Sequence, residues 1–328
     1  MIADVLQNAT FTDKEVEIAK HNATDALASR EADPSFLARR ALARVIFGGH
    51  PYSVIAPTKE SIANSTPDEL RREYARLFRP DQTLLVAVGD FQEAAMMAAI
   101  QHSLGKWAAP SEPPIPALAP PTQANQQAVF VVERPGSVQT TFSFAAFGPL
   151  GRDPDYAATQ LANAIYGGMF GSRLVKNIRE DKGYTYSPGG SMQPRRTIGV
   201  LQTRADVRND VTGATFNEIC YELNRMATTA PTEEEVVRAQ RYITGVRALS
   251  MQSEASVASQ LGSLWVRDLP SDEMATQIDN ILKAKAADVE AAGRKYFPAA
   301  RDAVVTVGEE KVIRQQLAPF GVPIKAAQ

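Results

Sequence analysis

The sequence has few of the residues on which disulfide and metal chemistry depend. Cys220 is the one cysteine among 328 residues, so no disulfide can form within the chain. Helical spacing places it beside other apolar positions, and we expect a buried, unreactive thiol. The three histidines, His21, His50 and His102, include no two that stand three or four residues apart. No helix face can therefore present the paired imidazoles of a His-x-x-Glu-His zinc site.

Long apolar runs and an excess of one charge are also missing. No uninterrupted apolar stretch approaches the ~18 to 20 residues that cross a bilayer, so we expect no membrane span. Lys and Arg number 35 against 37 Asp and Glu, a balance that favours neither nucleic acid nor an anionic membrane surface as a partner. There is no P-loop, dinucleotide fingerprint or nucleophile elbow, which argues against a nucleotide-dependent enzyme.

What is present is the composition of a globular protein, with 44% hydrophobic and 22% charged residues and a length suited to about two domains. Periodicity, caps and turn residues predict helices and strands in both halves. In the first half we expect helices at 12–29 and after Pro34, a helix capped by Thr66, a strand at Thr83–Asp90 and a helix at 91–107.

The second half is predicted to alternate in the same way. We expect strands at 129–133, 138–147, 184–193, 197–206 and 302–309. We expect helices at 154–166, 172–183, 208–227 and 232–251, more helix between 253 and 297, and a short helix at 311–320. Thr232 and Glu235 have the spacing of a capping box, and Gly183 should end the helix that carries Arg179.

A proline-rich stretch marks the expected domain boundary. Residues 109–121, APSEPPIPALAPP, contain six prolines and little that can pack, which predicts an extended linker between a domain at 1–108 and a domain at 122–328. The final strand and helix, DAVVTVGE and KVIRQQLAPF, echo TLLVAVGDFQEAAMMAAI in the first half. We therefore expect two copies of one α+β unit.

Two stretches of the sequence resemble one family of enzymes. HPYSVIAPTKESIANSTPDELRREYARLFRPDQTLLVAVGDF, at 50–91, resembles the end of the first domain of an insulinase/pitrilysin-type zinc metallopeptidase. GGMFGSRLVKNIREDKGYTYS, at 167–187, resembles the signature of that family's second domain. The resemblance implies an α+β fold of two homologous, sandwich-like domains, each a mainly antiparallel sheet covered by helices, the first lacking its N-terminal strands and zinc helix.

The resemblance also implies which parts of a zinc site are missing. Such enzymes hold zinc with two histidines of a His-x-x-Glu-His helix and a downstream glutamate, and the glutamate's position falls on Ala26 here. Asp25 is one residue, about 100°, around the helix and points elsewhere. MIADVLQNATF resembles the segment after the zinc helix. We therefore expect no metal bound by this chain, with zinc supplied by a partner chain or a missing N-terminal region.

The second domain of such enzymes contributes an arginine and a tyrosine that point at the substrate. The matching positions here are Arg179 and Tyr186. A phenol held near a developing oxyanion offers a preorganised hydrogen bond, and a guanidinium can bind peptide carbonyls or a carboxylate. In isolation, a helix-end arginine is usually solvated and a strand tyrosine usually belongs to the core. Tyr184 is expected to pack on the same strand face as Tyr186.

Three glycines flank this pair and are expected to serve the backbone. Gly167, Gly168 and Gly171 are interpreted as turn and close-packing positions, because no Gly-x-Gly-x-x-Gly fingerprint follows a strand.

Two functions follow as hypotheses. The first is a non-catalytic, substrate-binding part of a zinc metalloendopeptidase, which binds peptide or unfolded protein and acts in a heterodimer with a homologous zinc-binding chain or domain. It is expected to be inactive alone. The second is a catalytically inactive scaffold that resembles the core subunits of the respiratory cytochrome complex. The compartment, periplasm or cytoplasm, stays open.

Overall fold

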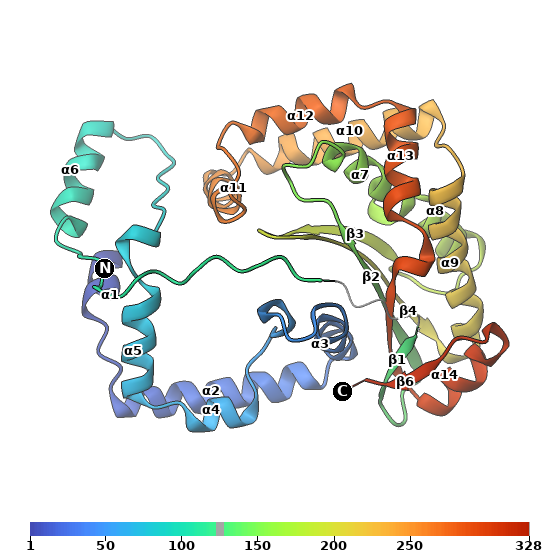
Figure 1. Cartoon of the computed structure of the whole chain (residues 1–328), viewed down its shortest axis with the longest axis horizontal. Coiled ribbons are helices and arrows are strands. Elements are labelled where there is room, and N and C mark those ends of the chain that lie inside the picture. Colours follow the sequence, from blue (N-terminus) through green and yellow to red (C-terminus); the bar gives the residue numbers. More distant parts are fainter. Residues whose placement is uncertain (123–127, 328) are drawn as a thin grey trace. The chain divides into compact units, whose positions relative to one another are not determined.

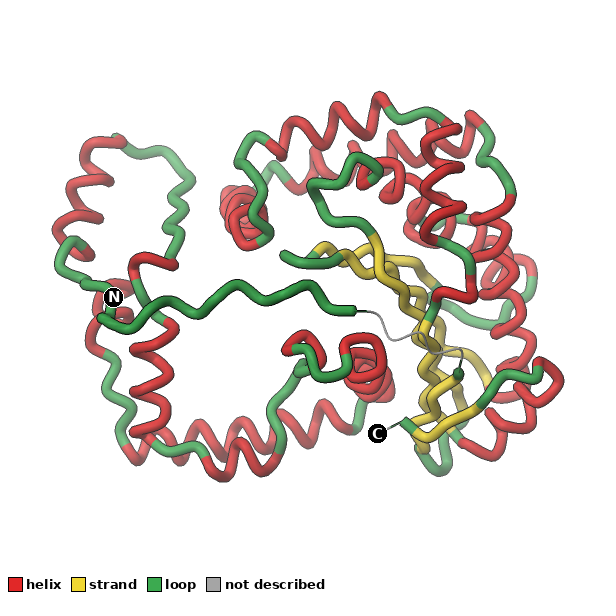
Figure 2. Tube along the Cα trace, in the orientation of Figure 1, coloured by secondary structure: helices red, strands yellow, loops and turns green. Residues whose placement is uncertain are grey.

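The structure is a computed structural model that describes residues 1–122 and 128–327. The fold is mixed α/β and 57% helical, with one six-stranded sheet among these residues (Figure 1, Figure 2). The chain packs as two units. The first comprises Met1–Arg30, Ala56–Leu118 and Ser253–Gly262, and the second comprises Glu31–Ile55, Ala119–Gln252 and Ser263–Gln328.

The first unit is helical throughout its regular structure. Local caps explain where its helices begin: Thr66 and Glu69 form a capping box, and Pro67 occupies the first turn of the helix it opens, as predicted. The helices of this unit are α1 (Ile2–Asn8), α2 (Asp13–Glu31), which enters the second unit at its last residue, α4 (Lys59–Asn64), α5 (Pro67–Leu77), α6 (Glu93–Leu104) and the start of α11 (Glu254–Val266).

The strand predicted at Thr83–Asp90 is wrong. These residues form no regular structure and join no β-ladder within the described chain. Leu84 is 41% exposed and Leu85 is 48% exposed, so the apolar run has found no covering face. A strand exists only when a neighbouring strand takes its main-chain hydrogen bonds, and the described residues of this unit provide none.

The second unit contains the sheet, whose strand order is β3-β4-β2-β5-β1-β6. The β3, β4, β2 and β5 strands pair antiparallel, whereas β1 pairs parallel with β5 and with β6, so the sheet is mixed rather than fully antiparallel. The strands are β1 (Val129–Glu133), β2 (Gln139–Gly148), β3 (Gly189–Pro194), β4 (Gly199–Arg208), β5 (Ala303–Gly308) and β6 (Ile324–Ala326).

Helices cover both faces of this sheet, as Figure 1 shows. On one face, which we call the main-core face, Phe142, Phe144 and Val207 pack beneath α7, α9, α13 and α14. On the other, which we call the α3 face, Phe147, Val200 and Val305 pack against α3. Residue alternation along each strand separates the two cores.

The helices of the second unit begin and end largely where caps and glycines predicted. Thr232 and Glu235 form the expected capping box. The α-helices are α3 (Pro34–Phe47), α7 (Tyr156–Asn163), α8 (Arg173–Val175), α9 (Thr212–Thr228), α10 (Glu233–Ser250), α12 (Glu273–Lys283), α13 (Ala286–Tyr296) and α14 (Glu310–Leu317). Two π-helices, η3 (Ala164–Gly168) and η4 (Lys176–Asp181), continue α7 and α8. Short 3-10 turns lie at Pro51–Ser53, Pro80–Gln82, Asn209–Val211, Ala299–Arg301 and Ala318–Phe320.

These bounds correct one expectation drawn from the sequence and bear on another. The strand predicted from residue 184 begins only at Gly189, so Tyr184 and Tyr186 lie in a loop and share no strand face. Residues 31–55 precede the proline-rich stretch and yet pack with the second unit. The division into domains at 109–121 stays a prediction. Among the helices described, none is both long and apolar enough to cross a bilayer.

Candidate functional site

Arg179 lies on the π-helix η4, which continues the short helix α8. Leu174 and Ile178 are fully buried and anchor this segment in the main core, because they recur at helical spacing. The helix ends at Asp181, and Gly183 closes the turn after it: its φ of 63° is left-handed, and its N–H donates to the Arg179 carbonyl at 3.1 Å. This turn brings the chain back past Arg179 and presents Tyr186 beside it.

Arg179 and Tyr186 are in contact through a cation–π interaction. The Arg179 Cζ atom lies 4.6 Å from the ring centroid of Tyr186 and 4.7 Å from that of Phe170. Tyr186 is 79% exposed and Phe170 is 62% exposed, so both rings reach solvent. Each such contact stabilises a surface pair by ~0.5 to 1 kcal/mol. The sequence predicted Arg179 and Tyr186 as site residues. It did not predict Phe170, which belongs to no spacing pattern that would have indicated it.

The guanidinium of Arg179 has no anionic partner in the structure. Within residues 1–122 and 128–327, no carboxylate forms an ion pair with Arg179 and no acceptor takes a hydrogen bond from it. Two aromatic rings thus fix the side chain while its five N–H donors stay available.

An open groove of about 320 Å³ adjoins Tyr186. The exposed β4 residues Asp206 and Arg208 alternate with buried Val207, so they lie on the α3 face of the sheet. Thr141 donates a hydrogen bond of 2.5 Å to Asp206. The groove lining comprises Gln139, Gly183, Tyr184, Thr185, Tyr186, Ser187, Asp206 and Arg208.

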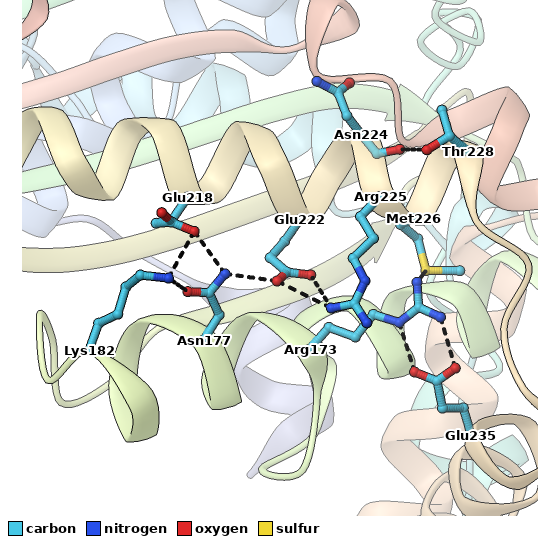
Figure 3. Close-up of polar contacts among 10 residues, drawn as sticks. All are labelled: Arg173, Asn177, Lys182, Glu218, Glu222, Asn224, Arg225, Met226, Thr228 and Glu235. Carbon is cyan, nitrogen blue, oxygen red and sulfur yellow. Dashed lines mark hydrogen bonds and ion pairs between the residues drawn. The ribbon is translucent and has the colours of Figure 1, made fainter.

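A network of polar side chains fixes η4 to helix α9 (Figure 3). The Asn177 amide donates to Glu218 at 2.9 Å and to Glu222 at 2.8 Å. Lys182 donates from its ammonium group to the side-chain Oδ1 of Asn177 and pairs with Glu218 at 3.1 Å. Because Glu222 and Asn177 are buried, these bonds satisfy groups that would be costly to leave unpaired.

A second polar contact fixes α8 to the start of α10. Arg173 makes a bidentate ion pair with Glu235 at 2.7 and 2.8 Å (Figure 3), and the two side chains are 6% and 16% exposed. The hydrogen bonds from Arg173 lower the pKa of Glu235 to about 2. Glu235 therefore both caps α10 and holds the helix that precedes Arg179, and only the first of these roles was predicted.

The neighbouring glycines have different packing. A Cβ atom on Gly167 would lie 2.7 Å from the main-chain nitrogen of Gly190, and one on Gly168 would lie 2.9 Å from the Asn163 amide. Both are close-packing positions, as expected. Gly171 has open space around its Cα and no positive φ, so close packing does not explain it. Tyr184 is half-buried in the loop.

The described residues do not fit a zinc centre. No group of three or more His, Cys, Asp or Glu side chains comes together among them. His21 is exposed and lies 3.5 Å from Asp25, which leaves Asp25 on the solvent side of α2 beside exposed Ala26. His50 instead caps the turn at 51–53. Burial raises the pKa of Cys220 to about 12, in keeping with an unreactive thiol.

The fold and these residues define a metallopeptidase-like α/β domain without metal ligands in its described part. A model of the peptidase M16 inactive domain matches residues 64–243, so the chain belongs to the peptidase M16 inactive-domain family. This confirms the resemblance to insulinase/pitrilysin-type proteins.

Relatives carry both peptidase and non-peptidase names. An uncharacterized zinc protease of Streptomyces coelicolor is 21% identical over 88% of this chain, and the non-peptidase homolog YmxG of Helicobacter pylori is 23% identical over 86%. The chain spans 65% of the length of each.

Solved structures share the fold at low identity. A peptidase M16 inactive domain from Pseudomonas fluorescens has a TM-score of 0.85 and 23% identity, over 99% of this chain and 75% of that one. A chain of complex III2 from Candida albicans has a TM-score of 0.77 and 19% identity, over 96% and 78%.

Proposed function

We propose that this chain is the non-catalytic, substrate-binding part of an M16-type zinc metallopeptidase. In this proposal Arg179 and Tyr186 bind an extended peptide, and the zinc centre belongs to a homologous partner chain or to a region N-terminal to this sequence. The chain alone does not hydrolyse peptides. Family membership and the zinc-protease names of several relatives support the class of activity.

One observation carries the assignment of the site. Arg179 is fixed by two aromatic rings at 4.6 and 4.7 Å, yet its N–H donors have no acceptor among the described residues. An ordered cation without a counter-ion, beside an open groove, is suited to bind carbonyl or carboxylate groups of a ligand. The Tyr186 hydroxyl is exposed at the same place and can donate a hydrogen bond to a peptide carbonyl oxygen.

Peptide binding to the purified chain tests this proposal. We expect fluorescence anisotropy with a labelled, unstructured peptide to show binding that Arg179→Gln weakens by about tenfold, because a charge-assisted hydrogen bond is lost. Tyr186→Phe should weaken it less. Arg196→Gln, at an exposed arginine outside the groove, is the matched control and should bind as the parent does. Equal binding by all four proteins would contradict the proposal.

Catalytic inactivity of the isolated chain is tested separately. We expect no cleavage of the labelled peptide by the chain alone, with or without added zinc. Cleavage that a chelator abolishes, retained through purification to homogeneity, would show that the division of labour is wrong.

A scaffold function is the second candidate. It is favoured by the structural similarity to a chain of complex III2 and by the relative named a non-peptidase homolog. A scaffold does not need an arginine free of partners, so Arg179→Ala would change stability alone. Absence of peptide binding, together with assembly of the chain into a stable complex, would favour this function.

A further inference from the structure

Strand β3 is an edge of the sheet. It stands at the end of the strand order and pairs with β4 alone among the described residues. In an antiparallel pair, about half of the main-chain N–H and C=O groups of each strand point away from the neighbour. The Gly190 carbonyl accepts a 3.4 Å contact from the side-chain amide of Asn163. The edge is therefore a template on which an extended peptide can add as a further strand.

A second partnerless arginine stands immediately after β3. The Arg195 Cζ atom lies 4.8 Å from the ring centroid of Phe47 and 4.8 Å from that of Tyr52. Within the described ranges no carboxylate or other acceptor pairs with its guanidinium. Arg195 is half-buried, and an arginine keeps its charge at neutral pH even where burial lowers its pKa. Arg195 thus repeats the arrangement of Arg179, which precedes β3.

The two arginines stack on rings beyond opposite ends of β3: Tyr186 precedes Gly189, and Arg195 follows Pro194. Phe47, on which Arg195 stacks, belongs to the core that α3 forms with the sheet. Tyr186, on which Arg179 stacks, lines the groove with Asp206 and Arg208, which alternation along β4 places on the same face as Val200.

Polar side chains connect the two stacks along β3. Ser191 is paired with Gln202 and Gln193 with Val200, and residues opposite each other in a ladder share a face. Both β3 side chains are exposed, and the Gln193 amide donates to Gln202 at 2.8 Å. The α3 face along β3 is therefore polar, and one aromatic-held guanidinium lies beyond each end of the strand.

We propose that β3 and its two aromatic-held arginines form a binding site for an extended acidic peptide, whose carboxylates are read by Arg179 at one end and Arg195 at the other. This rests on the proposed function and adds to it the class of peptide and a second recognition residue. Charge complementarity selects the occupant, because two ordered cations without counter-ions favour carboxylates over neutral or basic side chains.

The length of β3 sets an approximate spacing for the carboxylates. The six residues of β3 extend over about 20 Å at the usual rise of a strand. Side chains of an added strand alternate between faces, so two carboxylates on the α3 face are separated by an even number of residues. Two glutamates six residues apart should bind more tightly than two glutamates five residues apart in a peptide of the same composition.

The test compares three labelled peptides of about twelve residues by fluorescence anisotropy, with glutamates spaced six apart, spaced five apart, or replaced by glutamine. We expect the first peptide to bind about tenfold more tightly than the third, with the second between them. Arg195→Gln should remove most of this gain, whereas Arg196→Gln, its exposed neighbour, should retain it. Arg195→Glu should prefer a peptide with lysine at the corresponding position.

The outcomes separate this inference from the proposed function. If the three peptides bind equally and Arg179→Gln weakens them all, the proposed function stands and acidic recognition is wrong. Retention of the full gain by Arg195→Gln overturns the assignment of the second end. If no peptide binds, the proposed function and this inference both fall. Arg195→Lys, which keeps the charge, and the thermal midpoint of each variant show that lost selectivity is not unfolding.

Discussion

The two strand–helix segments of the chain have similar sequences and different structures. TLLVAVGD and DAVVTVGE are both apolar, β-branched runs that end in Gly and an acidic residue, and each is followed by a helix, α6 or α14. The second forms β5, in which Val305 is fully buried between β1 and β2. The first forms no strand and leaves Leu84 and Leu85 almost half exposed. Sequence pattern thus determines the propensity for a strand, and available partners determine whether it forms.

The sharpest way to test this comparison is to place the same charge in both segments. We expect Val305→Asp to destabilise the second unit by ~4 kcal/mol or more, because an unpaired carboxylate would be buried in the sheet. Leu85→Asp should change stability by less than ~1 kcal/mol, because the side chain already reaches water. Denaturant titration monitored by circular dichroism measures both. Similar losses for the two variants would show that residues 83–90 are packed after all.

Glycine substitutions next to the sheet edge ask how tightly the second unit is packed there. Gly167→Ala would place a Cβ 2.7 Å from the Gly190 nitrogen, which forces η3 away from β3 and should cost ~2 to 3 kcal/mol. Gly171→Ala meets open space and is the matched control, with an expected change below ~0.5 kcal/mol. Thermal unfolding of both variants decides the matter, and a neutral Gly167→Ala would mean that this edge yields easily.

Acid should cost more stability at the buried ion pair of the second unit than at its exposed counterpart in the first. The folded-state pKa of Glu235 is about 2, below its unfolded value, so its contribution is complete above pH ~5 and is lost as the pH falls towards 2. We expect a loss of ~2 kcal/mol after allowance for solvent screening. Denaturant titrations between about pH 6 and 2 measure this loss. The pH dependence of the free energy of unfolding should be flatter in Glu235→Gln than in the parent.

The exposed ion pair between Arg76 and Glu73, at 2.5 Å, provides the control. The hydrogen bond from Arg76 also lowers the pKa of Glu73, but water screens this exposed pair. Glu73→Gln should therefore change the acid dependence of unfolding much less than Glu235→Gln does. An equal effect of both substitutions would argue that the burial of Glu235 is unimportant.

The smallest effects should be the same in both units. Thr66→Ala and Thr232→Ala each remove the side chain of a capping box, and we expect a loss of ~1 kcal/mol from α5 and from α10. These motifs need only their own helix, so the absence of a sheet in the first unit is irrelevant to them. Hydrogen exchange of the first-turn amides measures each cap, and Thr66→Ser and Thr232→Ser should retain most of the protection. A large difference between the losses at the two caps would show that these motifs depend on more than their own helix.

These differences explain how far the sequence could predict the structure. The Thr66 cap, the Thr232 capping box, Gly183 and the apolar periodicity of 129–147 act over a few residues, and the elements they predicted are confirmed. The strand at 83–90 failed because its requirement, a neighbouring strand, is not encoded in its own residues.

The candidate site shows the same limit. The family signature brought Arg179 and Tyr186 to attention, but it placed Tyr186 on a strand where the structure has a loop. Asn177 and Glu222 stand far apart in sequence, and their pairing arises only when α9 packs on η4. Arg195 lies beside a predicted strand and belongs to no sequence motif. Its role as a candidate binding residue depends on the contact with Phe47, from another part of the chain.

Holding Arg179 between rings rather than beside a carboxylate has a consequence for how the site would respond to its surroundings. A counter-ion on the protein would neutralise the cation and would titrate in acid, whereas the π-faces of Phe170 and Tyr186 do neither. The positive charge is thus not neutralised by a carboxylate of the described residues. Dissolved salt becomes the agent that weakens it, since mobile anions can take the place that the protein leaves open.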